Sequence, residues 1–138
     1  MNRNHTVYTA LGVGLGVLLH VALQDRLTVH PYATWLGAFT VVTWALFVWD
    51  KRVAQMAPLL KGSRVPEFTL NLLALLGGFL GGWVARSMFR HKTNVKKHPW
   101  ILVSLIVGTL IHVYLTARII YGPELALWPP GSWVDFSG

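Results

Sequence analysis

The sequence contains no cysteine and little charge. With no cysteine among 138 residues, disulfides, thiolate metal sites and cysteine nucleophiles are excluded. Charged residues make up 12% of the chain, about half the share typical of a soluble domain. Hydrophobic residues make up 54%, which excludes a disordered chain and argues against a soluble globular one. The length leaves room for a single domain.

Familiar enzyme motifs are missing as well. The chain has no HExxH sequence, no phosphate-binding loop, no dinucleotide fingerprint and no serine in a glycine elbow. It has 5 Asp and Glu residues against 12 Lys and Arg, and spacing alone assigns no pair of carboxylates to acid–base catalysis. These absences favour a non-catalytic protein over an enzyme.

Four stretches of the sequence contain no Asp, Glu, Lys or Arg. They contain 21, 23, 18 and 20 residues and lie between Arg3 and Asp25, Arg26 and Asp50, Glu67 and Arg86, and Lys97 and Arg118. A helix needs about 20 apolar residues to cross a bilayer, and it satisfies its own backbone hydrogen bonds there. We therefore expect an all-α integral membrane helical bundle with four hydrophobic segments.

The expected layout is one membrane domain over residues 1–138. Its hydrophobic segments are about 6–24, 31–49, 68–85 and 99–121, with basic surface stretches at 50–67 and 86–97 and an aromatic interfacial tail at 127–138. Prolines at 31, 66 and 99 stand where apolar runs begin, a position at which a helix does not need the missing N–H.

The third apolar run can be interpreted in two ways. If it crosses, Lys and Arg divide six against six between the two sides, and the positive-inside rule gives no orientation. If it turns back at its central glycines as a re-entrant hairpin, the division is ten against two. The glycines also form the small-xxx-small pairs Gly77/Gly81 and Gly78/Gly82, which pack helices. We expect crossing, because run length is the more reliable signal.

Two histidines lie inside apolar runs. His20 follows Gly12 and Gly16 at intervals of four residues, and His112 follows Gly108 in the same way. Such stripes favour hydrogen bonding between closely packed helices. Neutral imidazole can also ligate haem iron or a chlorin magnesium, so a cofactor site remains an alternative. Only the re-entrant topology would make the first and last helices run in the same direction and place both histidines at one depth, about 20 Å from the basic face.

The basic stretches require an external anion, since acidic residues are few. At a membrane surface this anion is normally an anionic phospholipid, at about 1 kcal/mol for each Lys or Arg. The same residues would also suit a phosphate-bearing substrate. Nucleic acid is not expected as a partner, because the chain has no soluble surface on which aromatic residues could stack bases.

Several short motifs recur in the order of a known family. They are Asp50-Lys51, Arg64-Val65-Pro66-Glu67, the run LLALLGGFLG at 72–81, and Phe89-Arg90-His91-Lys92-Thr93. Over about residues 35–118 the chain resembles a bacterial family of small membrane proteins, the domain of unknown function 1294. The family continues from its His-Lys-Thr motif with basic residues and a phenylalanine, whereas Asn94-Val95 follows here.

The resemblance implies a location in the bacterial inner membrane but brings no established activity. It implies a shared site, formed by Asp50, Lys51, Arg64, Glu67, Arg90, His91, Lys92 and Thr93. The leading hypothesis is a multi-pass scaffold or accessory subunit that binds anionic phospholipid and other membrane subunits, with no metal or cofactor. The alternatives are a haem- or chlorin-binding subunit using His20 and His112, and an enzyme acting on a lipid phosphate at the cytoplasmic face.

Overall fold

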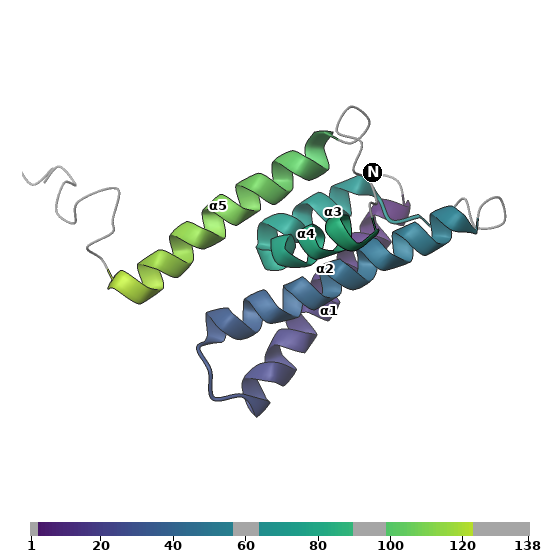
Figure 1. Cartoon of the computed structure of the whole chain (residues 1–138). Coiled ribbons are helices and arrows are strands. Elements are labelled where there is room, and N and C mark those ends of the chain that lie inside the picture. The colour runs from purple at the N-terminus through teal and green to yellow at the C-terminus, as the bar shows by residue number, and fades with distance from the viewer. Residues whose placement is uncertain (1–2, 57–63, 90–98, 123–138) are drawn as a thin grey trace, which may run out of the picture.

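Helices are the only regular secondary structure in the part of the chain that the structure describes. The computed structural model describes residues 3–56, 64–89 and 99–122, and no strand occurs among them. The helices are α1 (Arg3–Arg26), α2 (Pro31–Gln55), α3 (Glu67–Leu73), the π-helical segment η2 (Ala74–Gly78), α4 (Phe79–Phe89) and α5 (Pro99–Tyr121) (Figure 1). Four stretches, with α3, η2 and α4 taken together, are long and apolar enough to cross a membrane, which confirms the predicted fold class.

The third stretch does not continue straight. At its start, the backbone N–H of Val65 donates to Asp50, near the C-terminal end of α2. Farther along, the carbonyl of Leu76 accepts from the indole of Trp35, near the N-terminal end of α2. The chain then returns, since Gly82 lies against Phe47. Segments α3 and η2 therefore run antiparallel to α2, and α4 runs parallel to it (Figure 1).

Gly77 is the residue at which the direction reverses. Its φ of 127° lies in a region that residues with a Cβ rarely adopt, and it interrupts the helix within η2. The first arm, residues 67–78, would extend about 18 Å as a helix, well short of the roughly 30 Å hydrocarbon core. The expectation that the third run crosses is therefore wrong, and the chain forms the re-entrant hairpin. Run length misled here because it reports composition and carries no information on direction.

The first and last helices run in the same direction beside this hairpin. Near its start, α1 bonds the hairpin through Thr9 and Thr69, at an Oγ–Oγ distance of 2.9 Å. Near the start of α5, Ser104 donates to Asn71 of α3 at 3.1 Å. Both helices thus begin beside the C-terminal end of α2 and end beside its N-terminal end. Three helices have the length of a span, and the hairpin lies among them.

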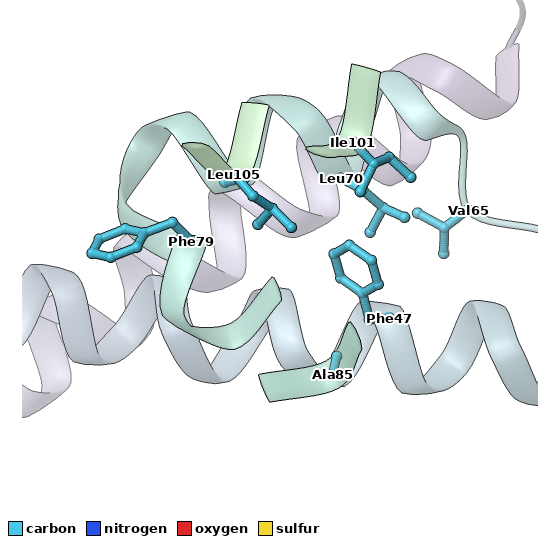
Figure 2. Close-up of a cluster of buried hydrophobic side chains, with 8 residues drawn as sticks. Phe47, Val65, Leu70, Phe79, Ala85, Ile101 and Leu105 are labelled. Carbon is cyan, nitrogen blue, oxygen red and sulfur yellow. The ribbon is translucent and has the colours of Figure 1, made fainter. Parts of the chain in front are cut away.

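A hydrophobic cluster joins the hairpin to α2 and α5. Figure 2 shows Phe79 at the turn of the hairpin, and Val65 and Ala85 toward its open end. Phe47 and Leu105 are almost completely buried between these points. Because both arms of the hairpin contribute to the same cluster, burial of its apolar surface stabilises the folded-back form.

The two ends of the bundle differ in charge. We call the end with the open side of the hairpin the basic end, and the end with the histidines the histidine end. Among described side chains of Lys and Arg, four belong to the basic end (Lys51, Arg52, Arg64 and Arg86) and two to the histidine end (Arg26 and Arg118). The fold-back produces this asymmetry, because it returns Arg86 to the side from which α3 started.

Candidate functional site

The predicted family site is partly described. Asp50, Lys51, Arg64 and Glu67 lie at the basic end, where the fold-back brings the end of α2 next to the start of α3. The predicted partners Arg90, His91, Lys92 and Thr93 lie outside the described residues.

Asp50 is the centre of the described part of this site. Its side chain is fully buried, and Oδ1 accepts the backbone N–H of Val65 at 3.1 Å. The Nε of Arg64 lies 3.6 Å from the same oxygen, with half of the arginine side chain exposed. A buried carboxylate is costly unless it is paired and hydrogen-bonded. Asp50 thus fixes the segment leading into α3 to the end of α2, which is a structural use of the carboxylate.

Next to this site, α2 lines a pocket that the sequence did not predict. The pocket measures about 360 Å³, and its lining includes Trp44, Lys51, Arg52 and Gln55. Trp44, Arg52 and Gln55 share one face of the helix with Val48, at spacings of three and four residues. That spacing is visible in the sequence, but it does not by itself indicate a pocket.

His20 belongs to a small polar network between α1 and α2. Its Nδ1 lies 3.0 Å from the hydroxyl oxygen of Thr34, which is buried. The same hydroxyl lies 2.8 Å from Oε1 of Gln24 and 2.8 Å from the carbonyl oxygen of Pro31. No described residue hydrogen-bonds to Nε2 of His20.

His112, on α5, hydrogen-bonds to the backbone at the turn of the hairpin. Its Nε2 lies 2.9 Å from the carbonyl oxygen of Leu75, so Nε2 carries a proton and donates. Nδ1 then accepts from the hydroxyl of Tyr32 at 2.7 Å. The ring is buried and stacks on Phe79. Both nitrogens of His112 thus have protein partners, and one of these bonds would be lost if the ring ligated a metal.

Two backbone carbonyls at the turn of the hairpin accept hydrogen bonds from side chains of neighbouring helices. The Leu76 carbonyl accepts from Trp35 at 2.6 Å, and the Leu75 carbonyl accepts from His112. Irregular backbone at membrane depth persists only where protein covers it and satisfies its polar groups. Trp35 and His112 provide this cover, and the sequence did not identify Trp35 in that role.

The two histidines lie on one pocket. It measures about 390 Å³ and is lined by His20, Pro31, Tyr32, Trp35, His112 and Leu115. The predicted match in depth therefore follows from the re-entrant topology, because both helices run the same way. Among the described residues, no group of three or more His, Cys, Asp or Glu side chains is arranged to hold a metal ion.

The glycines proposed for helix packing make close contacts within the chain. A Cβ added at any of these positions would meet another helix at or below ordinary contact distance (Gly12, Gly16, Gly77, Gly78, Gly81, Gly82 and Gly108). At Gly16 the ring of Phe39 would lie 2.8 Å away, and at Gly108 the carbonyl oxygen of Ala74 would lie 2.7 Å away. These surfaces are used inside the bundle, so they are not available to a partner.

The fold and the basic end define a polytopic helical membrane protein with a re-entrant hairpin. Residues 40–98 match the family model described as Protein of unknown function (DUF1294), which confirms the resemblance. The match covers the end of α2 and the whole hairpin, and it is shorter than the predicted range of 35–118. No curated protein and no solved structure matches the chain.

Proposed function

We propose that the chain is a small, non-catalytic membrane protein that holds anionic phospholipid at its basic end. The observation that carries this proposal is the fold-back, which gathers Lys51, Arg52, Arg64 and Arg86 at one end of the bundle. By the positive-inside rule this end faces the cytoplasm. In a bacterium, the corresponding leaflet is that of the inner membrane, whose anionic lipids attract such clusters.

The same protein would act as a scaffold or accessory subunit through its outer faces. In the most apolar 18-residue stretch of α1, 11% of the residues are buried, against 56% in the hairpin. The exposed face of α1 includes Leu11, Leu15 and Leu18. Because the glycines are used internally, a partner helix would pack on these larger side chains.

Native mass spectrometry tests this proposal directly. Protein isolated from its own membrane in a mild detergent should retain anionic phospholipid in preference to zwitterionic phospholipid, or other membrane subunits, or both. A lone monomer without lipid would contradict both parts of the proposal.

A cofactor-binding subunit is the second candidate. Two observations favour it. His20 and His112 line the same pocket, and no described residue hydrogen-bonds to Nε2 of His20. The bonds of His112 to Tyr32 and Leu75 oppose it. An absorption spectrum of natively isolated protein tests it, because a bound haem or chlorin gives bands above the tryptophan region.

An enzyme acting on a lipid phosphate has less support. In that hypothesis Arg64, Arg90, His91 and Lys92 would hold the phosphate, and Asp50 or Glu67 would be the base. Asp50 is fully buried and already accepts a backbone N–H. If the hypothesis holds, Glu67→Ala and His91→Ala should abolish a phenotype without preventing membrane insertion.

A further inference from the structure

Two pockets that share Trp44 follow one side of α2, and only the lower one also touches α4; together we call them the groove. The upper pocket lies at the basic end, and its described lining includes the polar side chains Lys51, Arg52 and Gln55 of α2. The lower pocket measures about 310 Å³, has an apolar lining, and includes Gly81, Val84 and Met88. Trp44 lines both pockets and joins them. The groove therefore passes from a cationic mouth to an apolar floor.

The distance from the deep end of the groove to its first cation matches one leaflet of a bilayer. Thr40 lines its deep end and Lys51 its mouth, and these residues are 11 positions apart on α2. At 1.5 Å per residue the distance along α2 from Thr40 to Lys51 is about 16 Å, and half of a 30 Å hydrocarbon core is about 15 Å. An acyl chain that starts at the basic end would reach the deep end of the groove.

Gly81 forms the floor of the apolar part. The backbone of Thr40 lies so close that a Cβ at Gly81 would collide with its carbonyl oxygen. The lack of a side chain at Gly81 lets α4 approach α2 closely, and the apolar hollow lies beside this contact, lined by Val84 and Met88 of α4 and Trp44 of α2. The side chains of Val84 and Met88 are 45% and 61% exposed, and they form the wall of this hollow.

Trp44 provides a polar group at the junction of the two pockets. Its indole N–H makes no hydrogen bond to any described residue, and the side chain is 37% exposed. Tryptophan is enriched at this depth of a membrane because its ring is apolar and its N–H is polar. In a lipid bound here, an ester carbonyl would lie between the phosphate and the acyl chain, within reach of that donor.

From this arrangement we infer that one anionic glycerophospholipid binds in the groove, with its phosphate at Lys51 and Arg52 and an acyl chain over Gly81. The inference rests on the proposed function and specifies where the lipid sits. The charge of the mouth selects an anionic headgroup, and the apolar floor requires a long chain. A phosphate ion without a chain would occupy only the mouth.

The first test compares two variants that lose equal charge. Each purified variant is mixed with dioleoyl phosphatidylglycerol or dioleoyl phosphatidylcholine, and bound lipid is counted by native mass spectrometry. K51Q/R52Q should bind phosphatidylglycerol about 30-fold less tightly, the equivalent of about 2 kcal/mol for two cations. R26Q/R118Q removes two cations at the histidine end and should stay within threefold of wild type. R52Q alone, which keeps Lys51, should lose about fivefold.

The second test fills the apolar hollow. V84W should lower the affinity for dioleoyl phosphatidylglycerol at least tenfold. It should leave the affinity for dihexanoyl phosphatidylglycerol unchanged, because the acyl chains of that lipid are short. V113W, at a position 59% exposed on α5, is the matched control and should change neither. Circular dichroism and thermal unfolding establish that each variant is folded.

The outcomes separate this inference from the proposed function. If wild-type protein prefers phosphatidylglycerol but V84W has no effect, the groove is overturned and lipid binding at the basic end stands. If both double variants lose phosphatidylglycerol equally, the lipid is not held at the basic end, and the groove and the proposed function are both overturned. If wild-type protein does not distinguish the two lipids, both are overturned.

Discussion

The first helix and the hairpin start from nearly the same sequence pattern and end in different structures. Both are long apolar runs with glycines four residues apart, Gly12/Gly16 in α1 and Gly77/Gly81 in the hairpin. Yet α1 is continuous from Arg3 to Arg26 and largely exposed, whereas the hairpin reverses at Gly77 and is largely buried. Glycine permits a reversal, but a reversal also exposes backbone groups, and these need partners.

The comparison teaches that the surroundings of a run decide whether it crosses. Trp35 and His112 supply donors for the carbonyls of Leu76 and Leu75 at the turn of the hairpin. On α1, Gly12 and Gly16 instead lie against side chains of Leu73 and Phe39, and the helix has no break to satisfy. The predictions below test this difference, from the largest expected effect to the smallest.

The sharpest test of the hairpin is the side on which its two ends emerge. The chain has no cysteine, so single cysteines can be introduced at Arg64, Ser87 and Arg26. In intact spheroplasts, a membrane-impermeant maleimide should label R26C and leave R64C and S87C unlabelled until the membrane is opened. Labelling of R64C and S87C from opposite sides would show that the third run crosses.

The close approach of α4 to α2 should be the most sensitive contact. Gly81→Leu places a side chain against the backbone of Thr40, which cannot move aside as a side chain can. We expect a loss of about 3 kcal/mol or more in the free energy of unfolding, measured by SDS titration in mixed micelles. The control is Gly14→Leu on α1, where a Cβ meets nothing within 4 Å. Equal losses at the two sites would remove the distinction between the regions.

Loss of the Asp50 carboxylate, which accepts from Val65 at the start of the hairpin, should have an intermediate effect on stability. Asp50→Ala leaves the buried N–H of Val65 without its acceptor, and we expect a loss of about 1–3 kcal/mol in the free energy of unfolding. Asp25, exposed near the end of α1, provides the matched substitution Asp25→Ala, which should have little effect. An Asp50→Ala variant as stable as the wild type would contradict the anchoring role given to the carboxylate.

Removal of the Trp35 N–H, which donates at the turn of the hairpin, should have the smallest measurable effect on the free energy of unfolding. Trp35→Phe keeps an aromatic ring but removes the N–H that reaches Leu76. Hydrogen bonds between membrane helices contribute on average about 0.6 kcal/mol and at most about 1.7 kcal/mol. The same substitution at Trp100, which is 67% exposed, serves as the control for unfolding in SDS. A larger loss at Trp100 than at Trp35 would contradict the role given to the turn.

Part of the candidate site was accessible to sequence reasoning. Asp50, Arg64 and the glycine run were identified from recurring motifs, and the matched range of 40–98 includes all of them. The shared depth of His20 and His112 followed from counting residues once re-entry was assumed. Tyr32 and Trp35 were not assigned, because each hydrogen-bonds to a residue distant in sequence. Trp44 lines a pocket with residues close to it on α2, but spacing along one helix does not reveal a pocket.

The amino-acid sequence alone determined that this chain is helical and belongs in a membrane, because apolar run length is a local property that depends on no other segment. Only the tertiary structure decided that residues 67–89 fold back and that four described cations share one end. That outcome depends on hydrogen bonds between residues far apart in sequence, such as the bond from Trp35 to Leu76, 41 positions away. Hydropathy cannot register such bonds, since it sums over neighbours in sequence and not over neighbours in space.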